Sequence, residues 1–295
     1  MARINIEFSR FSAFYTPLIM TMAGSFLQRE GLEPEYTVSP PGTSAIASLL
    51  DDSVHVVQSA PSQAFAALEK GQAPLVTHFA QINETDGFFL NGRTTDPEFS
   101  WFKLVGKKVL VDHGGQPLAM FKYACFKEGV EFSAIDAVDA GTTDEMEHAF
   151  RAGEGDYIHA QGPTPQQLEK EGIGHVVASV GEAVGVCAFS SLAATRDWQN
   201  SDMASTFMMA YRDARKLINS APASEIAKME IEYFPRVDVD VLTDTIGFYQ
   251  RLGCWTPHVE ITREAFEGAL NVFLHAGSIT ARHDYELAVS SPPAA

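Results

Sequence analysis

The sequence predicts an α/β protein of two lobes, each built around a mainly parallel sheet. Segments typical of strands alternate with segments typical of helices, and after residue 100 this order starts again. The chain has 295 residues, 45% of them hydrophobic, which is more than one ordinary α/β lobe needs. Sheets of this kind bind ligands at the carboxyl ends of their strands. We therefore expect a site for a small molecule at those ends.

The first lobe opens with an alternating strand. An aromatic loop leads from it through Pro17 into an apolar helix, and a Pro- and Gly-containing turn at residues 40–44 precedes the next helix. The expected strands span residues 3–10, 35–39, 54–57 and 75–80, and the later helices span residues 45–51 and 63–70. The polar stretch at residues 91–100 indicates a crossing to the second lobe.

The second lobe repeats the plan of the first. Its expected strands span residues 104–112, 132–139, 156–159 and 175–179, and its helices span residues 118–129 and 144–152. Residues 190–195 are interpreted as the return crossing. Four helices follow at residues 201–220, 223–234, 238–252 and 262–276, and the tail at residues 290–295 is expected to be loose. Lobe 1 thus comprises residues 1–90 and 190–295, and lobe 2 comprises residues 91–189.

Composition excludes several classes of partner. The net charge is −17 and no Lys/Arg cluster is dense enough to neutralise phosphates, so we expect no nucleic acid and no anionic membrane surface. Cys125, Cys187 and Cys254 are widely spaced and odd in number, which predicts buried free thiols. No stretch approaches the ~20 apolar residues of a membrane span, and residues 1–15 lack signal-peptide features. The expected location is cytoplasmic, or periplasmic where a leader has been removed.

The candidate site consists of loops that converge at the strand ends. These loops are residues 9–15, 41–44, 59–63, 113–117 and 156–162, with residues 83–86 at the hinge. The candidate ligand-binding residues are Ser12, Phe14, Tyr15, Thr43, Ser44, Ser59, Ser62, Asn83, His113, Gln116, Tyr157 and His159. Ser44, Ser62 and Gln116 lead into helix N-termini, whose free N–H groups suit a polar ligand atom. The alternative for the two serines is simple helix capping.

Aromatic and charged residues constrain the ligand further. Four aromatic side chains could stack a flat ligand, although each could equally belong to a core. They are Phe11, Phe14, Tyr15 and Tyr157. The acidic candidates Glu84, Asp86, Asp112 and Asp156 face only Arg10. This balance favours a neutral or cationic heterocycle over a doubly charged anion.

The histidines indicate hydrogen bonding rather than metal binding. His113 and His159 lie near carboxylates but lack HxxxH spacing and a Cys partner, so we expect no metal. His55 and His78 are interpreted as interior residues. GxGxxG, P-loop and GxSxG motifs are absent, so no cofactor is expected.

Four segments in order carry a resemblance to a known family. They are residues 14–19, 24–32, 64–76 and 104–111, and later segments extend the likeness from Ile4 to Ile279. In this order the chain resembles the nitrate/sulfonate/taurine-type substrate-binding proteins of ABC transporters, a family that includes the thiamine-pyrimidine synthases. The resemblance implies a type II periplasmic-binding-protein fold with a ligand cleft between the lobes, closure about a hinge, a permease partner and a monomer.

Two enzyme branches of the same fold fit this sequence poorly. The synthases carry a histidine and a cysteine-rich run where this chain has Gln63 and, around Cys187, a single cysteine. The aromatic sulfinate desulfinases use a cysteine where this chain has Ser12, a poor nucleophile without a partner base. We therefore expect a solute-binding protein without catalytic residues. The alternative is a cytoplasmic enzyme or ligand sensor that acts on a small aromatic or heterocyclic compound.

Overall fold

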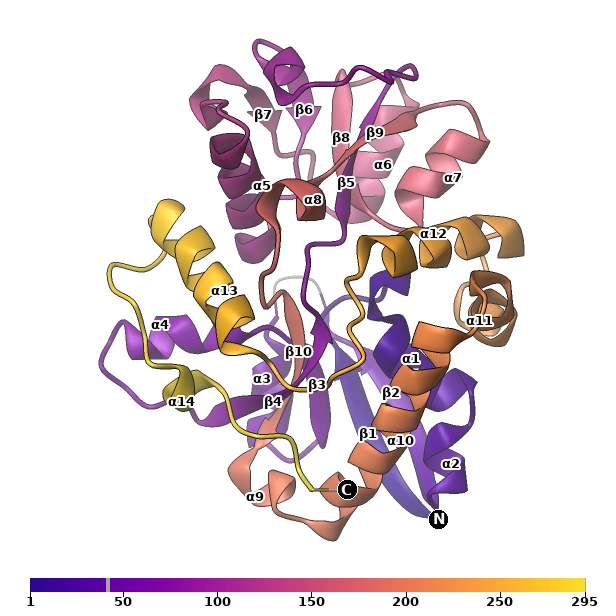
Figure 1. Ribbon diagram of the computed structural model, residues 1–295, viewed down its shortest axis with the longest axis vertical. Coiled ribbons are helices and arrows are strands. Elements are labelled where there is room, and N and C mark those ends of the chain that lie inside the picture. The colour runs from indigo at the N-terminus through magenta and orange to yellow at the C-terminus, as the bar shows by residue number, and fades with distance from the viewer. Residues whose placement is uncertain (41–42, 295) are drawn as a thin grey trace. The chain divides into compact units, whose positions relative to one another are not determined.

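A computed structural model describes residues 1–40 and 43–294 of the chain. The chain divides into two compact units. Unit 1 consists of residues 1–84 and 187–295, and unit 2 consists of residues 85–186. The boundaries expected from the sequence, after residues 90 and 189, fall a few residues later. Each unit holds one five-stranded sheet with helices against it (Figure 1), so the prediction of two α/β lobes is confirmed.

The sheet of unit 1 has the strand order β2-β1-β3-β10-β4. β1 pairs in parallel with β2 and β3, whereas β10 runs antiparallel to β3 and β4. The strands are β1 Ala2–Phe8, β2 Leu32–Val38, β3 Val56–Ser59, β4 Val76–Asn83 and β10 Ser190–Thr195. β10 corrects the sequence analysis, because the stretch interpreted as a return crossing is a full strand of this sheet.

Helices cover the sheet of unit 1. α3 packs Ala45 and Leu49 on Val57 and Ala193 of the sheet, and α10 packs against α1 and α2 (Figure 1). The α-helices are α1 Thr16–Ala23, α2 Phe26–Arg29, α3 Ala45–Leu50, α4 Phe65–Leu68, α9 Arg196–Gln199, α10 Asp202–Ser220, α11 Ala223–Glu230, α12 Val239–Leu252, α13 Arg263–His275 and α14 Tyr285–Ala288. The 3₁₀ turns are η1 Ala13–Tyr15, η2 Pro61–Ala64 and η5 Ile231–Tyr233.

The outer edge of β4 is closed by other parts of unit 1. The backbone N–H of Gln81 donates to the carbonyl of Val259, and that of Glu84 donates to the carbonyl of Cys254. At the other end, Ser290 donates to the carbonyl of His78. Covered strand edges are protected from pairing with other chains. The tail that was expected to be loose is therefore attached at Ser290.

Unit 2 repeats the strand order of unit 1 as β7-β6-β8-β5-β9. β6 pairs in parallel with β7 and β8, and β5 runs antiparallel to β8 and β9. The strands are β5 Phe88–Gly92, β6 Lys108–Leu110, β7 Asp136–Val138, β8 Tyr157–Gln161 and β9 His175–Ser179. The helices are α5 Gly115–Lys127, α6 Thr143–Arg151, α7 Thr164–Lys170 and α8 Val180–Val184, with η3 Trp101–Leu104 and η4 Phe132–Ala134.

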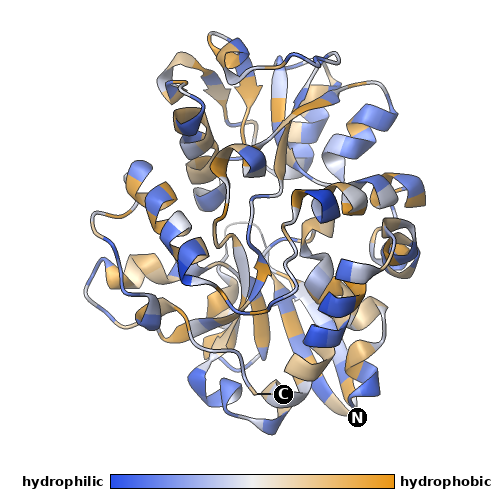
Figure 2. Cartoon of the chain, viewed as in Figure 1, coloured by the Kyte–Doolittle hydropathy of each residue, from blue (hydrophilic) through white to orange (hydrophobic). Residues whose placement is uncertain are grey.

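The core of unit 2 lies on both faces of its sheet. On one face, Ile158 and Ala160 of β8 pack against Met146 and Phe150 of α6 and against Leu168 of α7. The helices of both units mix hydrophilic and hydrophobic residues (Figure 2). This is the pattern of helices that bury one side on a sheet. No helix in the described ranges is long and apolar enough to span a membrane.

Candidate functional site

The carboxyl-terminal edge of the unit 1 sheet brings several predicted residues together. β1, β3 and β4 run in the same direction, and β10 runs the opposite way. The ends of the first three and the start of β10 therefore share one edge, where Ser190 pairs with Asn83 and Ser191 pairs with Ser59. Ser12, in the loop after β1, is also buried. The predicted residues at this edge are Ser12, Ser59, Ser62 and Asn83.

Asn83 is the most constrained of these residues. It is fully buried, and its Nδ2 donates to the carbonyl of Phe14 at 2.7 Å. Its Oδ1 has no hydrogen-bond partner within residues 1–40 and 43–294, and neither has the buried Oγ of Ser191. A buried polar atom left without a partner costs about 1–3 kcal/mol. This edge therefore offers both an acceptor and a hydroxyl to a bound molecule.

Gln58 organises the loop after β1, and the sequence analysis did not select it. Its Oε1 accepts from the Oγ of Ser9 at 2.7 Å and from the backbone N–H groups of Ser9 and Arg10 at 3.1 and 3.3 Å. Its Nε2 reaches the Oγ of Ser190 at 3.4 Å. The sequence feature that could have identified Gln58 is its amide, which lies near the end of a short strand that begins with two valines. Gln58 thus fixes the loop that carries Ser12.

The aromatic candidates of unit 1 belong to its core. Phe14 is fully buried and Tyr15 is 3% exposed. The ring of Phe14 packs against Phe189 and Tyr249, with centroids 5.3 and 5.1 Å apart. Its carbonyl also accepts from the Nε1 of Trp255 at 3.0 Å. Phe14 and Tyr15 are therefore core residues, which is the alternative that the sequence left open.

The helix-capping alternative for the two serines is not what the structure shows. Ser44 precedes α3 but makes no capping hydrogen bond, and Ser62 lies inside η2. Thr43 and Ser44 are exposed, and Thr43 donates from its Oγ1 to the carbonyl of Pro40 at 2.7 Å. Residues 41–42 of the same predicted loop lie outside the described residues.

Glu84, the last residue of unit 1, has partners within that unit. Its Oε1 accepts from the Oγ1 of Thr262 at 2.7 Å, and its Oε2 lies 3.3 Å from the Nε2 of His258. These contacts anchor the end of β4 to the loop before α13. These contacts account for the position of Glu84 without a bound ligand.

Acidic groups lie at the corresponding edge of unit 2. β6 and β8 end there, and β5 starts there. Asp86, two residues before β5, is fully buried, and its Oδ1 accepts from the backbone N–H of Phe88 at 2.6 Å. Burial, together with the charge of Asp112, raises the pKa of Asp86 to about 7. A carboxyl that titrates near neutrality is a common feature of functional sites.

Three candidates from the sequence follow β6, namely Asp112, His113 and Gln116. The Oδ1 of Asp112 accepts from the backbone N–H of Gly114 at 2.8 Å. The Nδ1 of His113 lies 2.7 Å from the carbonyl of Val111, and Gln116 lies in the first turn of α5. The fold thus places His113 and Gln116 at the expected edge.

Tyr157 and His159 do not lie where the sequence analysis placed them. Tyr157 is the first residue of β8, so it and Asp156 lie at the amino-terminal end of the strand, away from the proposed edge. His159 is mid-strand, fully buried and stacked on Phe88 and Phe121, with centroids 4.6 and 4.9 Å apart. The predicted strand stopped at residue 159, whereas β8 continues to Gln161.

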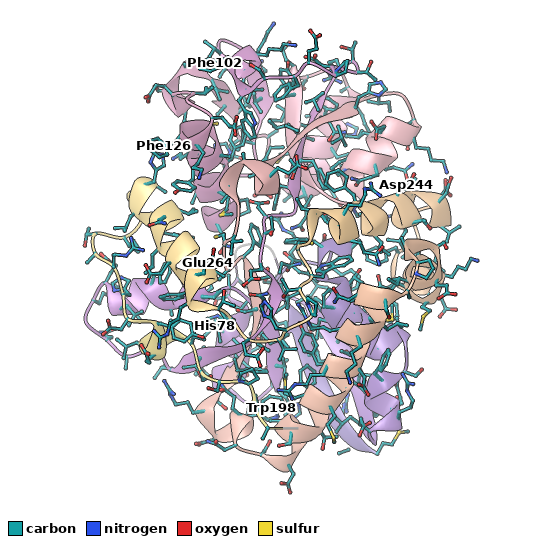
Figure 3. The ribbon with its side chains drawn as sticks, viewed as in Figure 1. His78, Phe102, Phe126, Trp198, Asp244 and Glu264 are labelled. Carbon is teal, nitrogen blue, oxygen red and sulfur yellow. The ribbon has the colours of Figure 1, made fainter. Side chains whose placement is uncertain are left out.

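The described residues include no group of three or more His, Cys, Asp or Glu side chains that could hold a metal ion. His78 illustrates an interior histidine (Figure 3). It lies in β4, is 1% exposed, and its Nε2 lies 3.3 Å from the Oγ of Ser59. Burial lowers the pKa of His78 to about 4. His78 is therefore neutral at physiological pH, and its ring contacts Ser59, the last residue of β3.

Comparison with solved structures places the fold. The alkanesulfonate-binding protein SsuA of Xanthomonas axonopodis pv. citri, bound to MOPS, superposes with a TM-score of 0.75 at 15% identity and covers 99% of both chains. The periplasmic aliphatic sulphonate-binding protein SsuA of Escherichia coli gives a TM-score of 0.75 at 14% identity, covering 100% of this chain and 94% of the other. The expected periplasmic-binding-protein fold is confirmed.

Sequence comparison identifies the family. A Bacillus subtilis (strain 168) protein described as "Putative binding protein YtlA" is 26% identical over 294 residues, which cover 98% of this chain and 88% of the relative. Residues 13–225 match the family described as "NMT1/THI5 like". That match covers well over half of the sequence and agrees with the resemblance found in the residues. The chain belongs to the NMT1/THI5-like family.

Proposed function

We propose that this protein is the solute-binding component of an ABC-type importer and captures a small organic molecule at the strand-end loops of its sheets. The observation that carries the proposal is the set of buried polar atoms without partners at those ends. They include the Oδ1 of Asn83 in unit 1 and the Oδ2 of Asp86 in unit 2. Binding sites of this kind pair apolar walls with a few such anchors.

The relatives support the same function. The solved structures include sulfonate-binding proteins and the nitrate-binding protein NrtA of Synechocystis PCC 6803, which has a TM-score of 0.62 at 15% identity. By analogy we propose a permease as partner and a periplasmic place of action, with a monomeric binding protein. The anionic ligands of those proteins do not transfer directly, because the edge of unit 2 carries carboxylates.

Native mass spectrometry of freshly purified protein tests the proposal. We expect one retained small molecule in stoichiometric amount, and we expect its removal to lower the melting temperature, because a ligand that binds only the folded state stabilises it. An Asn83→Leu variant should lose the molecule, and an Asn200→Leu variant, which makes the same change at an exposed residue, is the matched control. Retention by both variants, or no ligand-dependent change in melting temperature, would contradict the proposal.

A second candidate function, an enzyme on the same fold, is favoured by Asp86 alone, because its pKa of about 7 suits acid–base chemistry. Incubation of the protein with its retained molecule separates the two functions. An importer component returns the molecule unchanged, whereas an enzyme converts it and loses that conversion in an Asp86→Asn variant.

A further inference from the structure

We propose that unit 2 carries a subsite for an amidinium or guanidinium group, formed by Asp86, Gln161 and Asp112. The inference rests on the proposed function and names the polar group of the solute. It is supported by the positions of these residues, by their unused hydrogen-bonding capacity and by the charge of the sheet edge.

The three residues lie on neighbouring strands of one sheet edge. Asp112 follows β6, Gln161 ends β8, and Asp86 precedes β5, in a sheet whose order is β6-β8-β5. Phe88 is the direct cross-strand partner of Gln161, and its backbone N–H donates to Asp86. Directly opposed residues of antiparallel strands lie only about 4.5–5.5 Å apart. Asp86 and Gln161 therefore both lie beside Phe88.

Asp86 and Gln161 have unused hydrogen-bonding capacity. Neither the Oδ2 of Asp86 nor the two amide atoms of Gln161 has a hydrogen-bond partner in the part of the chain that the structure describes. The two residues are 0% and 7% exposed. Buried polar groups are almost always paired in proteins. The Oδ2 of Asp86 and the Oε1 of Gln161 accept hydrogen bonds, so a bound group that meets both atoms would have to be rich in N–H donors.

The charge of this edge favours a cation. Asp112 is 5% exposed, and its negative charge acts on Asp86, another acid. Sulfonate or nitrate oxygens would meet like charge here. A planar cation with two parallel N–H groups matches a carboxylate and spreads its charge over both donors. An amidinium or guanidinium group has that shape.

The surroundings suit a flat group. Gln161 lies two residues after His159 on β8, so their side chains share one face of the sheet. That face carries the stack of Phe88, His159 and Phe121. α8 approaches so closely that a Cβ on Gly181 would lie 2.3 Å from the carbonyl oxygen of Asp86. The backbone beside Asp86 is therefore tightly enclosed, which limits the subsite to a small head group.

Titration calorimetry of the full chain at pH 8 tests the subsite with three ring compounds. Benzamidine carries the proposed cation, benzamide is its neutral analogue, and benzenesulfonate is an anion of similar size. We expect benzamidine to bind at least tenfold more tightly than the other two. Asp86→Asn and Gln161→Met should each weaken benzamidine at least tenfold. Asp156→Asn removes an exposed carboxylate from the far end of β8 and should leave affinity unchanged.

The outcomes separate this inference from the proposed function. Asp86→Asn is isosteric, and its thermal unfolding curve shows whether it is folded. Equal affinity of the unaltered protein for benzenesulfonate and benzamidine, unchanged affinity in folded Asp86→Asn, or no binding of benzamidine would each overturn the subsite. A retained small molecule would still uphold the proposed function in all three cases, and its absence would overturn that function alone.

Discussion

The two units share a strand order but differ in the chemistry at the carboxyl ends of their parallel strands. In each unit the fourth strand in the order is antiparallel and is the first strand of that sheet to follow a passage between the units, β10 in unit 1 and β5 in unit 2. Unit 1 places amides and hydroxyls at its edge, such as Gln58 and Asn83, whereas unit 2 places Asp86 and Asp112 there. The fold thus determines where polar groups gather, and individual residues determine their charge.

Each unit contains an arginine that donates hydrogen bonds to backbone carbonyls, but the two arginines differ in burial. Replacing the buried one should cause the largest loss of stability. Arg215 of α10 is fully buried and donates to the carbonyls of Gln81, Ile82 and Thr256. Replacing it with Met leaves several buried acceptors unpaired, at about 1–3 kcal/mol each. We expect Arg215→Met to lower the free energy of unfolding by roughly 3–5 kcal/mol in chemical denaturation.

Arg93 is the matched control in unit 2. It donates to the carbonyls of Phe150 and Gly155 and stacks on the Phe150 ring at 3.5 Å, but it is only half-buried. Water can replace its hydrogen bonds, so we expect Arg93→Met to cost about 1–2 kcal/mol. An equal cost for the two variants would show that burial does not distinguish the arginines.

Much of this architecture was predictable from the sequence, because hydrophobic period and turn residues are local signals. The two lobes and most strands follow from them, as do the loops that hold Ser12 and His113. The predicted strand at residues 156–159 ends two residues too early, so Tyr157 is expected near its carboxyl end, whereas it is the first residue of β8, which continues to Gln161. Arg215 and Gln58 could not be found, since their partners lie more than 40 residues away.

Buried titrating groups in the two units should make stability depend on pH in opposite directions. Asp86 in unit 2 should give the larger effect. Its pKa rises from 3.8 in the unfolded chain to about 7 in the fold. The protonated form is therefore favoured by folding, so its stabilisation is complete below pH 3.8 and is lost as pH rises to about 7. At about 1.4 kcal/mol per pKa unit, the loss is about 4 kcal/mol. The difference in unfolding free energy between unaltered protein and Asp86→Asn, measured from pH 4 to pH 8, should show it.

A flat difference over that range would mean that the carboxyl of Asp86 is ionised in the fold. An ionised Asp86 would still suit a cation, so this result would leave the proposed ligand class unchanged. It would show only that burial does not raise the pKa of Asp86.

His78 of unit 1 should give a smaller effect of opposite sign. Burial lowers its pKa from 6.5 to about 4, so folding favours the neutral ring. The stabilisation is complete above pH 6.5 and is lost as pH falls to about 4, by about 3 kcal/mol. The unfolding free energy of the unaltered protein minus that of His78→Gln should therefore fall with acidification, while the Asp86 difference grows. If both differences change in the same direction, the contrast between the neutral buried His78 of unit 1 and the titrating Asp86 of unit 2 does not hold.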